Sequence, residues 1–361
     1  MRAFVTGQVG VEKVPYLEAV KAEALRNGFD LEVCHVGKMM YAEAPDVPAG
    51  RILNLPITRL NSLRRAVFKE ILAIAQRHEH VIINSHATFR WRHGLFSAFD
   101  FDQIKALSPD LYVTLLDNVE SVHQRLLRDH DLDHSLKDIM VWREEELLAT
   151  EIIANITRGY GHFFMISRGR KTPNVQTLHE LMFAPKKKRA YLSFPMSHVM
   201  ELPQTLAEIT QFKEAISRHF ITFDPSDVDE LVLHTMALKA MEEGRTVIEV
   251  QAAEGPITLK TADVAQISGD IMGQIYARDF KMIDQSDIIV SLVPELPGGK
   301  PGLSSGVERE LHHAFEGGKE VYVIWTCRAT PSPFITETAT RVFATTQEAI
   351  EYFRQRGYLD N

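Results

Sequence analysis

The chain has 361 residues, an ordinary globular composition and a formal net charge of −8. This length predicts two domains that each bury a core, and the acidic balance argues against a nucleic-acid partner. The only cysteines, Cys34 and Cys327, lie far apart without a CxxC partner, so we expect neither a disulfide framework nor a metal site. No apolar run reaches the roughly 18 residues of a membrane helix, and no signal-peptide pattern opens the chain. We therefore expect a cytoplasmic protein without a membrane partner.

The first half alternates short apolar runs with amphipathic helices. Strands are predicted at residues 1–6, 30–36, 80–86, 111–117 and 162–166, and helices up to residue 27 and at 61–77, 119–128 and 142–158. This alternation is typical of an α/β domain with a doubly wound, mostly parallel sheet.

The segment after the first strand approaches the phosphate-binding pattern G-x-x-x-x-G-K-[ST]. Gly7 and Lys13 have the required spacing, and Gly10 lies between them. Glu12 replaces the second glycine, and Val14 replaces the hydroxyl that would hold Mg²⁺. The sequence therefore leaves two alternatives open: this loop binds a nucleotide, or it only shapes the fold.

Residues 1–170 resemble the archaeal-type adenylate kinases and related P-loop nucleoside monophosphate kinases. The resemblance rests on the first strand, loop and helix, on the Ser85–Thr88 strand end, and on the order of the remaining elements. It implies ATP and Mg²⁺ as cofactors, with Gly7, Gly10 and Lys13 at the phosphates.

The same resemblance gives roles to four arginines. It implies that Arg90 and Arg92 lie near a nucleotide acceptor and that Arg125 and Arg128 belong to a lid. For Arg90 and Arg92 the alternative is an exposed loop of mixed composition.

A polar, basic stretch separates the two halves. Residues 171–188 are predicted as a linker between a domain at 1–170 and a domain at 189–361. One amphipathic segment, 175–182, is predicted as a short helix inside this connection.

The second half repeats the α/β pattern. Strands are predicted at residues 190–194, 221–224, 287–292, 320–325 and 341–344, helices at 205–219, 227–243, 271–285, 304–316 and 346–356, and a β-hairpin at 245–261. We therefore expect a second doubly wound, mostly parallel domain that carries a hairpin insert.

One strand, loop and helix of this half can bind an anion. After the strand at 287–292 and a Pro/Gly-rich loop at 294–302, a helix opens on Ser304, Ser305 and Gly306. A helix start of this kind presents backbone N–H groups to a phosphate. Glu310 follows about a turn and a half later. On its own, this glutamate also fits a solvated position that complements the helix dipole.

Residues 189–345, without the hairpin, resemble the nucleoside 2-deoxyribosyltransferase superfamily and, within it, the deoxynucleoside 5′-monophosphate N-glycosidases. The motif is Ser304-x-Gly306-Val307-x-x-Glu310-Leu311, with Asp279 eight residues before Asp287 and a Tyr-Leu-Ser-Phe-Pro strand end that begins at Tyr191.

This resemblance implies a reaction that needs no cofactor, and a homo-oligomer whose subunits complete the site. Glu310 would attack C1′ of the sugar, and Asp279 would hold or protonate the departing base. Tyr191 would line the pocket, while Ser304, Ser305 and Gly306 would bind a 5′-phosphate. His312 and His313 stand where the family has a glycine followed by Tyr or Arg. Two alternatives stay open: a different substrate or pocket shape, or histidines that lie on the surface or only pack against the helix.

Three functions are therefore compatible with the sequence. The first is cleavage of the N-glycosidic bond of a nucleotide, by hydrolysis or base transfer, with an accessory nucleotide-binding domain. The second is a nucleoside monophosphate kinase, and the third is a nucleotide sensor without catalysis.

Overall fold

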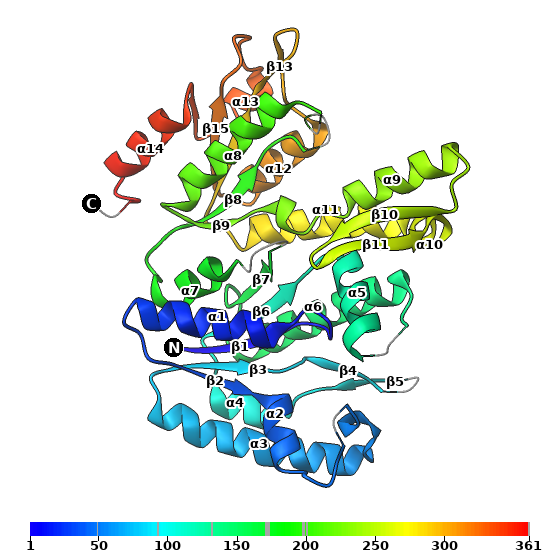
Figure 1. Cartoon of the computed structure of the whole chain (residues 1–361). Helices are drawn as coiled ribbons and strands as arrows, with labels where there is room; N and C mark the ends of the chain where they lie inside the picture. Colours follow the sequence, from blue (N-terminus) through cyan, green and yellow to red (C-terminus); the bar gives the residue numbers. More distant parts are fainter. Residues whose placement is uncertain are drawn as a thin grey trace. The chain divides into compact units, whose positions relative to one another are not determined.

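The structure is a computed structural model that describes residues 1–48, 50–91, 94–130, 133–169, 174–196, 199 and 201–359. Its contacts divide the chain into two compact units. The first unit comprises Met1–Met182 and Val228–Gly273, and the second comprises Phe183–Asp227 and Gln274–Asn361. Figure 1 labels the elements of both units.

The first unit is built on a five-stranded parallel sheet. Its strands are β1 (Arg2–Thr6), β2 (Leu31–His35), β3 (His80–Asn84), β6 (Leu111–Leu116) and β7 (Phe163–Ser167), in the order β2-β3-β1-β6-β7. Every residue of β6 is buried, as expected for a central parallel strand. The chain leaves β1 toward β2 on one side and leaves β6 toward β7 on the other. The carboxyl ends of β1 and β6 therefore form the topological switch point, where open α/β sheets bind ligands.

Helices connect these strands. They are α1 (Lys13–Arg26), α2 (Val36–Ala42), α3 (Ile57–Arg77), α4 (Phe101–Leu107), α5 (Val119–His130), α6 (Leu136–Thr157) and α7 (Val175–Phe183), with a 3-10 turn at Ile52–Asn54. The apolar face of α3 contributes Val67, Phe68 and Ile71 to the core that also holds Phe4 of β1. A short antiparallel hairpin, β4 (Thr88–Trp91) with β5 (Gly94–Ser97), follows β3.

A second segment of the chain completes the first unit. It contains α9 (Leu231–Glu242), the hairpin of β10 (Val247–Ala252) and β11 (Gly255–Lys260), α10 (Thr261–Gln266) and the start of α11 (Ser268–Asp284). The hairpin, yellow-green in Figure 1, contacts α5 as well as α9 and α10. One face of β10 is buried and the other exposed, which matches its alternating sequence.

The second unit repeats the parallel arrangement. Its strands are β8 (Arg189–Ser193), β9 (Ile221–Phe223), β12 (Ile288–Val293), β15 (Glu320–Trp325) and β16 (Arg341–Phe343), in the order β16-β15-β12-β8-β9. The chain leaves β8 toward β9 and leaves β12 toward β15, so the switch point of this sheet lies at the carboxyl ends of β8 and β12.

Helices and two small elements surround this sheet. The helices are α8 (Pro203–Ser217), α12 (Ser305–Glu316), α13 (Pro333–Thr336) and α14 (Thr346–Gln355), and β13 (Glu295–Leu296) pairs with β14 (Lys300–Pro301). A 3-10 turn spans Pro225–Asp227. Phe212 and Phe220, from α8 and the turn after it, pack with Tyr322 of β15 and Phe353 of α14 in one core.

The predicted fold class is confirmed, since both five-stranded sheets are wholly parallel and the predicted hairpin forms. Several local features differ, among them the following. The stretch after β3, expected as a loop, forms the β4–β5 hairpin. The helix expected from residue 142 begins at Leu136, because Ser135 accepts a hydrogen bond from Asp138 N (3.1 Å) and caps it.

The grouping by contacts also differs from the domain boundaries expected at 1–170 and 189–361. Val228–Gly273, expected in the second domain, packs with the first unit. A buried ion pair contributes to this, because Arg143 Nη1 of α6 lies 2.5 Å from Glu230 Oε1. Within the described ranges, no helix combines the length and apolar character required to cross a membrane.

Candidate functional site

Two glycines shape the loop between β1 and α1. Gly7 has φ +142°, and a Cβ there would lie 2.8 Å from the carbonyl oxygen of Leu115 in β6. Gly10 has φ +86°, and its Cβ would lie 3.1 Å from Val122 and 3.2 Å from Leu126 of α5. Only glycine fits either position without strain. The loop is thus packed closely between the end of β6 and α5, at the switch point of the first sheet.

Lys13 opens α1 and folds back over this loop. Its Nζ donates a hydrogen bond to the carbonyl oxygen of Gly7 and lies 3.4 Å from each ring nitrogen of His86. Burial lowers the pKa of Lys13 to about 8, although the charge of Glu146 opposes that shift. An ammonium has three donors, so this side chain can hold the loop and also bind a phosphate oxygen.

Glu146 of α6 binds the backbone of the same loop and that of the segment after β3. Its carboxylate accepts hydrogen bonds from the N–H groups of Gly7 (3.2 Å) and Ala87 (2.8 Å). It also accepts from the N–H (2.9 Å) and the hydroxyl (2.7 Å) of Thr88. Burial favours the protonated acid, but the His86 ring and the neighbouring donors and charges lower the pKa of Glu146 to about 2. This buried carboxylate therefore ties the ends of β1 and β3 together as an anion.

Glu12 occupies the place of the second glycine in the phosphate-loop pattern. Its backbone is left-handed, with φ 57° and ψ 51°, which explains in physical terms why that pattern has glycine there. Its carboxylate is 2.9 Å from Arg168, 3.8 Å from Arg125 and 3.7 Å from Arg128. Its negative charge is thus surrounded by three cations.

The arginines expected near a nucleotide acceptor are only partly described. Arg90 lies on β4, and its Nε and Nη2 donate to Glu145 Oε2 at 2.9 and 2.7 Å. Arg92 lies outside the described residues. Their contact with a nucleotide stays a prediction.

The second unit brings Glu310 to its own switch point. Glu310 of α12 is 8% exposed, and its two carboxylate oxygens accept hydrogen bonds from the hydroxyls of Tyr191 (2.9 Å) and Ser193 (2.6 Å). Burial, with the charge of Asp279 second, raises the pKa of Glu310 to about 8. Burial and the charge of Glu310 likewise raise the pKa of Tyr191 well above its usual value, so its hydroxyl remains a donor. Tyr191 and Glu310 are therefore in contact, and Asp279 is close enough for its charge to act on both; their roles stay a prediction.

The three residues predicted to bind phosphate have different surroundings at the start of α12. Ser304 is the N-cap, and its hydroxyl accepts a hydrogen bond from Val307 N (3.2 Å). Ser305 and Gly306 are exposed in the first turn. The Ser304 hydroxyl therefore serves the helix itself, while the N–H groups of the first turn remain the part of this predicted site suited to an anion.

No role followed from the motifs for Ser193, although it stands in the Tyr-Leu-Ser-Phe-Pro strand end, or for Glu146, which lies outside every motif. Ser193 lies two positions after Tyr191 on β8, and residues two apart on a strand share a face, so that spacing was a usable signal. Glu146 lies in the middle of a helix, and no local pattern distinguishes it from the neighbouring glutamates.

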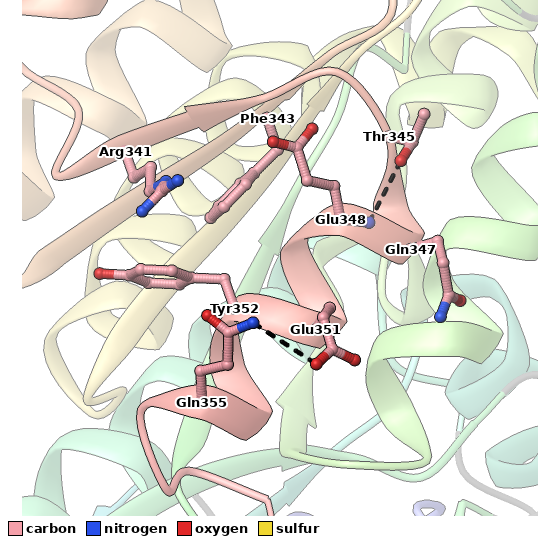
Figure 2. Close-up of a pocket in the computed structure, with 8 residues that line it drawn as sticks. All are labelled: Arg341, Phe343, Thr345, Gln347, Glu348, Glu351, Tyr352 and Gln355. Carbon is pink, nitrogen blue, oxygen red and sulfur yellow. Dashed lines mark hydrogen bonds between the residues drawn. The ribbon is translucent and has the colours of Figure 1, made fainter.

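Figure 2 shows a further pocket on the second unit, between β16 and α14, with a volume of about 340 Å³. It is lined by Arg341, Phe343, Thr345, Gln347, Glu348, Glu351, Tyr352 and Gln355. The Arg341 guanidinium lies 4.5 Å from the centre of the Tyr352 ring, and Thr345 caps α14 by accepting from Glu348 N (3.1 Å). These groups serve the local fold, and the pocket contains none of the predicted site residues.

Across the part of the chain that the structure describes, no group of three or more His, Cys, Asp or Glu side chains could hold a metal ion.

Comparison with known proteins gives one family match, which lies within the first unit. Residues 7–143, fewer than half of the chain, match the sequence profile of a family described as AAA domain. No curated protein matches the chain. The solved structure of the tunicamycin resistance protein of Deinococcus radiodurans is similar over 51% of this chain and 94% of its own, at 14% identity and a TM-score of 0.30. The profile match covers the β1–α1 loop and supports nucleotide binding by the first unit. The likeness of residues 189–345 to deoxyribosyltransferases stays a prediction.

Proposed function

We propose that the chain is a nucleotide-binding protein whose first unit holds the phosphates of a nucleotide at the loop between β1 and α1. The observation that carries this proposal is the position of Lys13, which folds over Gly7 at the switch point of the sheet. Residues 7–143, which match the AAA domain profile, include both residues. A buried lysine beside a tightly turned loop is suited to phosphate oxygens.

Binding without phosphoryl transfer fits this loop better than kinase activity. Val14 offers no oxygen to Mg²⁺, and Asp117, which follows β6, is paired with Arg125 at 2.7 Å. The site therefore does not fit the metal that phosphoryl transfer requires. A nucleoside monophosphate kinase remains the alternative function.

Calorimetric titration with ATP, ADP and AMP tests this proposal. Lys13→Met should weaken binding at least about tenfold, since it removes a charge-assisted contact to phosphate. Lys21→Met is the matched control, because Lys21 lies on the same helix but pairs with Glu32 at the surface. Absence of binding for all three nucleotides would overturn the proposal, and phosphate transfer from ATP to a monophosphate would establish the kinase instead.

The geometry around Glu310 favours a second activity, cleavage of an N-glycosidic bond in the second unit. The Glu310 carboxylate would attack C1′ of a nucleotide while the C1′–N bond breaks and its electron pair leaves with the base. Asp279 would hold or protonate the departing nitrogen. Water or a second base then releases the sugar from Glu310. The two hydroxyl donors on Glu310 support this proposal, because they fix the direction of the carboxylate.

Chromatography of free base after incubation with deoxynucleoside monophosphates tests this second activity. Glu310→Ala should abolish base release, whereas Glu308→Ala, an exposed change on the same helix, should leave it intact. Base release should increase as the pH rises toward 8, because the attacking carboxylate must be ionised. A folded protein that releases no base from any common nucleotide would exclude the reaction.

A further inference from the structure

Three arginines form a cationic cluster beside the β1–α1 loop. Arg125 and Arg128 lie on α5, and Arg168 follows β7. Arg125 is 1% exposed, and its Nη1 donates to Asp117 (2.7 Å) and to the carbonyl oxygen of Gly10 in the loop (2.9 Å). Its Nη2 and the Nε of Arg168 are buried, with no hydrogen-bond partner among the described residues. Such groups can still donate a hydrogen bond to another acceptor.

The tip of the β10–β11 hairpin reaches this cluster. Its turn consists of Ala253 and Glu254, and the N–H of Ala253 donates to Ser121 Oγ of α5 (3.0 Å). One oxygen of Glu254 accepts from Arg125 Nε (2.9 Å), and the other pairs with Arg128 Nη1. A single carboxylate thus bridges two guanidinium groups with both oxygens, as a phosphate group can.

One of the carboxylates around the loop comes only with the docked hairpin. The cations are Arg125, Arg128 and Arg168, and the carboxylates are Glu12, Asp117, Asp129 and Glu254. Glu12 and Asp117 belong to the β1–α1 loop and the end of β6, whereas Glu254 comes from a hairpin more than a hundred residues later. Undocking of the hairpin would remove one of these four carboxylates and free Arg125 Nε and Arg128 Nη1, which face Glu254. That state favours a polyanion.

We propose that Glu254 acts as an internal phosphate mimic, so that docking of the β10–β11 hairpin and binding of a nucleotide's phosphates at Arg125 and Arg128 exclude each other. This inference rests on the proposed nucleotide binding of the first unit and adds its regulation. The hairpin holds the empty site closed, and a nucleotide that displaces Glu254 releases the hairpin tip from α5. A hairpin tip that is released from α5 then signals that a nucleotide occupies the site.

Titration of the full chain with ATP tests the exclusion. Glu254→Gln keeps the shape of the side chain but removes the charge that pairs with the arginines, so ATP should bind about tenfold more tightly than to the unchanged chain. Glu249→Gln is the matched control, because it removes the same charge from the exposed face of the same hairpin. It should leave the affinity unchanged.

Each outcome separates the two proposals. Equal affinity of ATP for the unchanged chain and for Glu254→Gln would overturn the exclusion and leave nucleotide binding in place. An equal gain in both variants would also overturn it, because net charge alone would explain the result. If the unchanged chain, Glu254→Gln and Glu249→Gln all fail to bind ATP, the proposal of nucleotide binding is overturned, and the proposed exclusion falls with it.

Hydrogen exchange on the unchanged chain provides a second test that needs no substitution. Saturating ATP should increase the exchange of backbone amides at the hairpin tip, residues 252–255, because the Ala253 contact with Ser121 is lost. Unchanged or slower exchange with ATP bound would contradict the exclusion, even if the Glu254→Gln protein failed to fold.

Discussion

Two buried glutamates show how the neighbours of a carboxylate decide its charge. Glu146 accepts four hydrogen bonds from Gly7, Ala87 and Thr88, and its pKa falls to about 2 despite burial. Glu310 has two hydroxyl donors and a carboxylate nearby, and burial raises its pKa to about 8. The first glutamate is suited to a structural role, whereas the second exchanges a proton near neutral pH.

We expect Glu310→Gln to stabilise the protein at pH 8 and to change its stability little at pH 4. The folded pKa of about 8 exceeds the ordinary value of 4.5, so the folded state binds the extra proton between these values. The stability of the unchanged protein is therefore lost progressively as the pH rises from about 4.5 to 8, by on the order of 4 kcal/mol from this group. Urea unfolding at both pH values measures the difference, and Glu308→Gln, exposed on the same helix, is the control. An equal effect of Glu310→Gln at pH 4 and pH 8 would contradict the raised pKa.

At the scale of the element, the backbone of two glycines determines the shape of the β1–α1 loop more than its side chains do. Gly7 brings the loop against the carbonyl oxygen of Leu115, and Gly10 brings it against Val122 and Leu126. The loop is therefore built into the packing between β6 and α5, and its shape does not depend on a bound ligand.

We expect Gly7→Ala to destabilise the first unit by about 2–3 kcal/mol and to weaken nucleotide binding. A Cβ would lie 2.8 Å from the Leu115 carbonyl oxygen, and φ +142° is unfavourable for alanine. Gly37→Ala is the control, because a Cβ there meets nothing within 4 Å and alanine favours the helix. Thermal unfolding checks both variants, and a Gly7→Ala protein as stable as the Gly37→Ala protein would contradict the expected strain.

At the scale of the whole molecule, the first unit is made from two segments that are distant in the chain. Glu230 and the hairpin come from Val228–Gly273, yet they supply the partners of Arg143 and Arg125. Residues 1–182 alone therefore lack the Glu230 carboxylate that pairs with the buried Arg143, and they keep Asp117 but not Glu254 beside Arg125.

We expect a chain that ends at residue 182 to be destabilised by about 3–5 kcal/mol or to remain unfolded, since Arg143 would stay buried without Glu230. Joining residues 228–273 to residue 182 through a long Gly/Ser linker should restore stability. Circular dichroism during heating compares the two proteins. A shortened chain that melts at the same temperature as the linked one would show that the second segment adds nothing to the first unit.

Much of the fold follows from local sequence, whereas the site's charge network does not. The apolar runs of β6 and β12 and the alternation of β10 predict strands directly. Tyr191, Asp279 and Glu310 follow from a motif. Glu230 and Glu254 could not be predicted, because each acts on an arginine 87 or 129 residues away and no periodic pattern records such a distance.

The interleaving of the two units has a consequence for synthesis of the chain. A ribosome that adds about 5–20 residues per second needs several seconds to pass from Arg143 to Glu230, 87 residues later. By the end of that interval the parallel strands of the first sheet have all been made, but the buried Arg143 still lacks the carboxylate of Glu230. β8 and β9 of the other sheet emerge in the same interval and must wait longer still for β12. Neither unit can finish folding before the other has begun. We therefore expect slow folding that is completed late in synthesis. Until then, apolar strands stay exposed, and a chaperone would protect them.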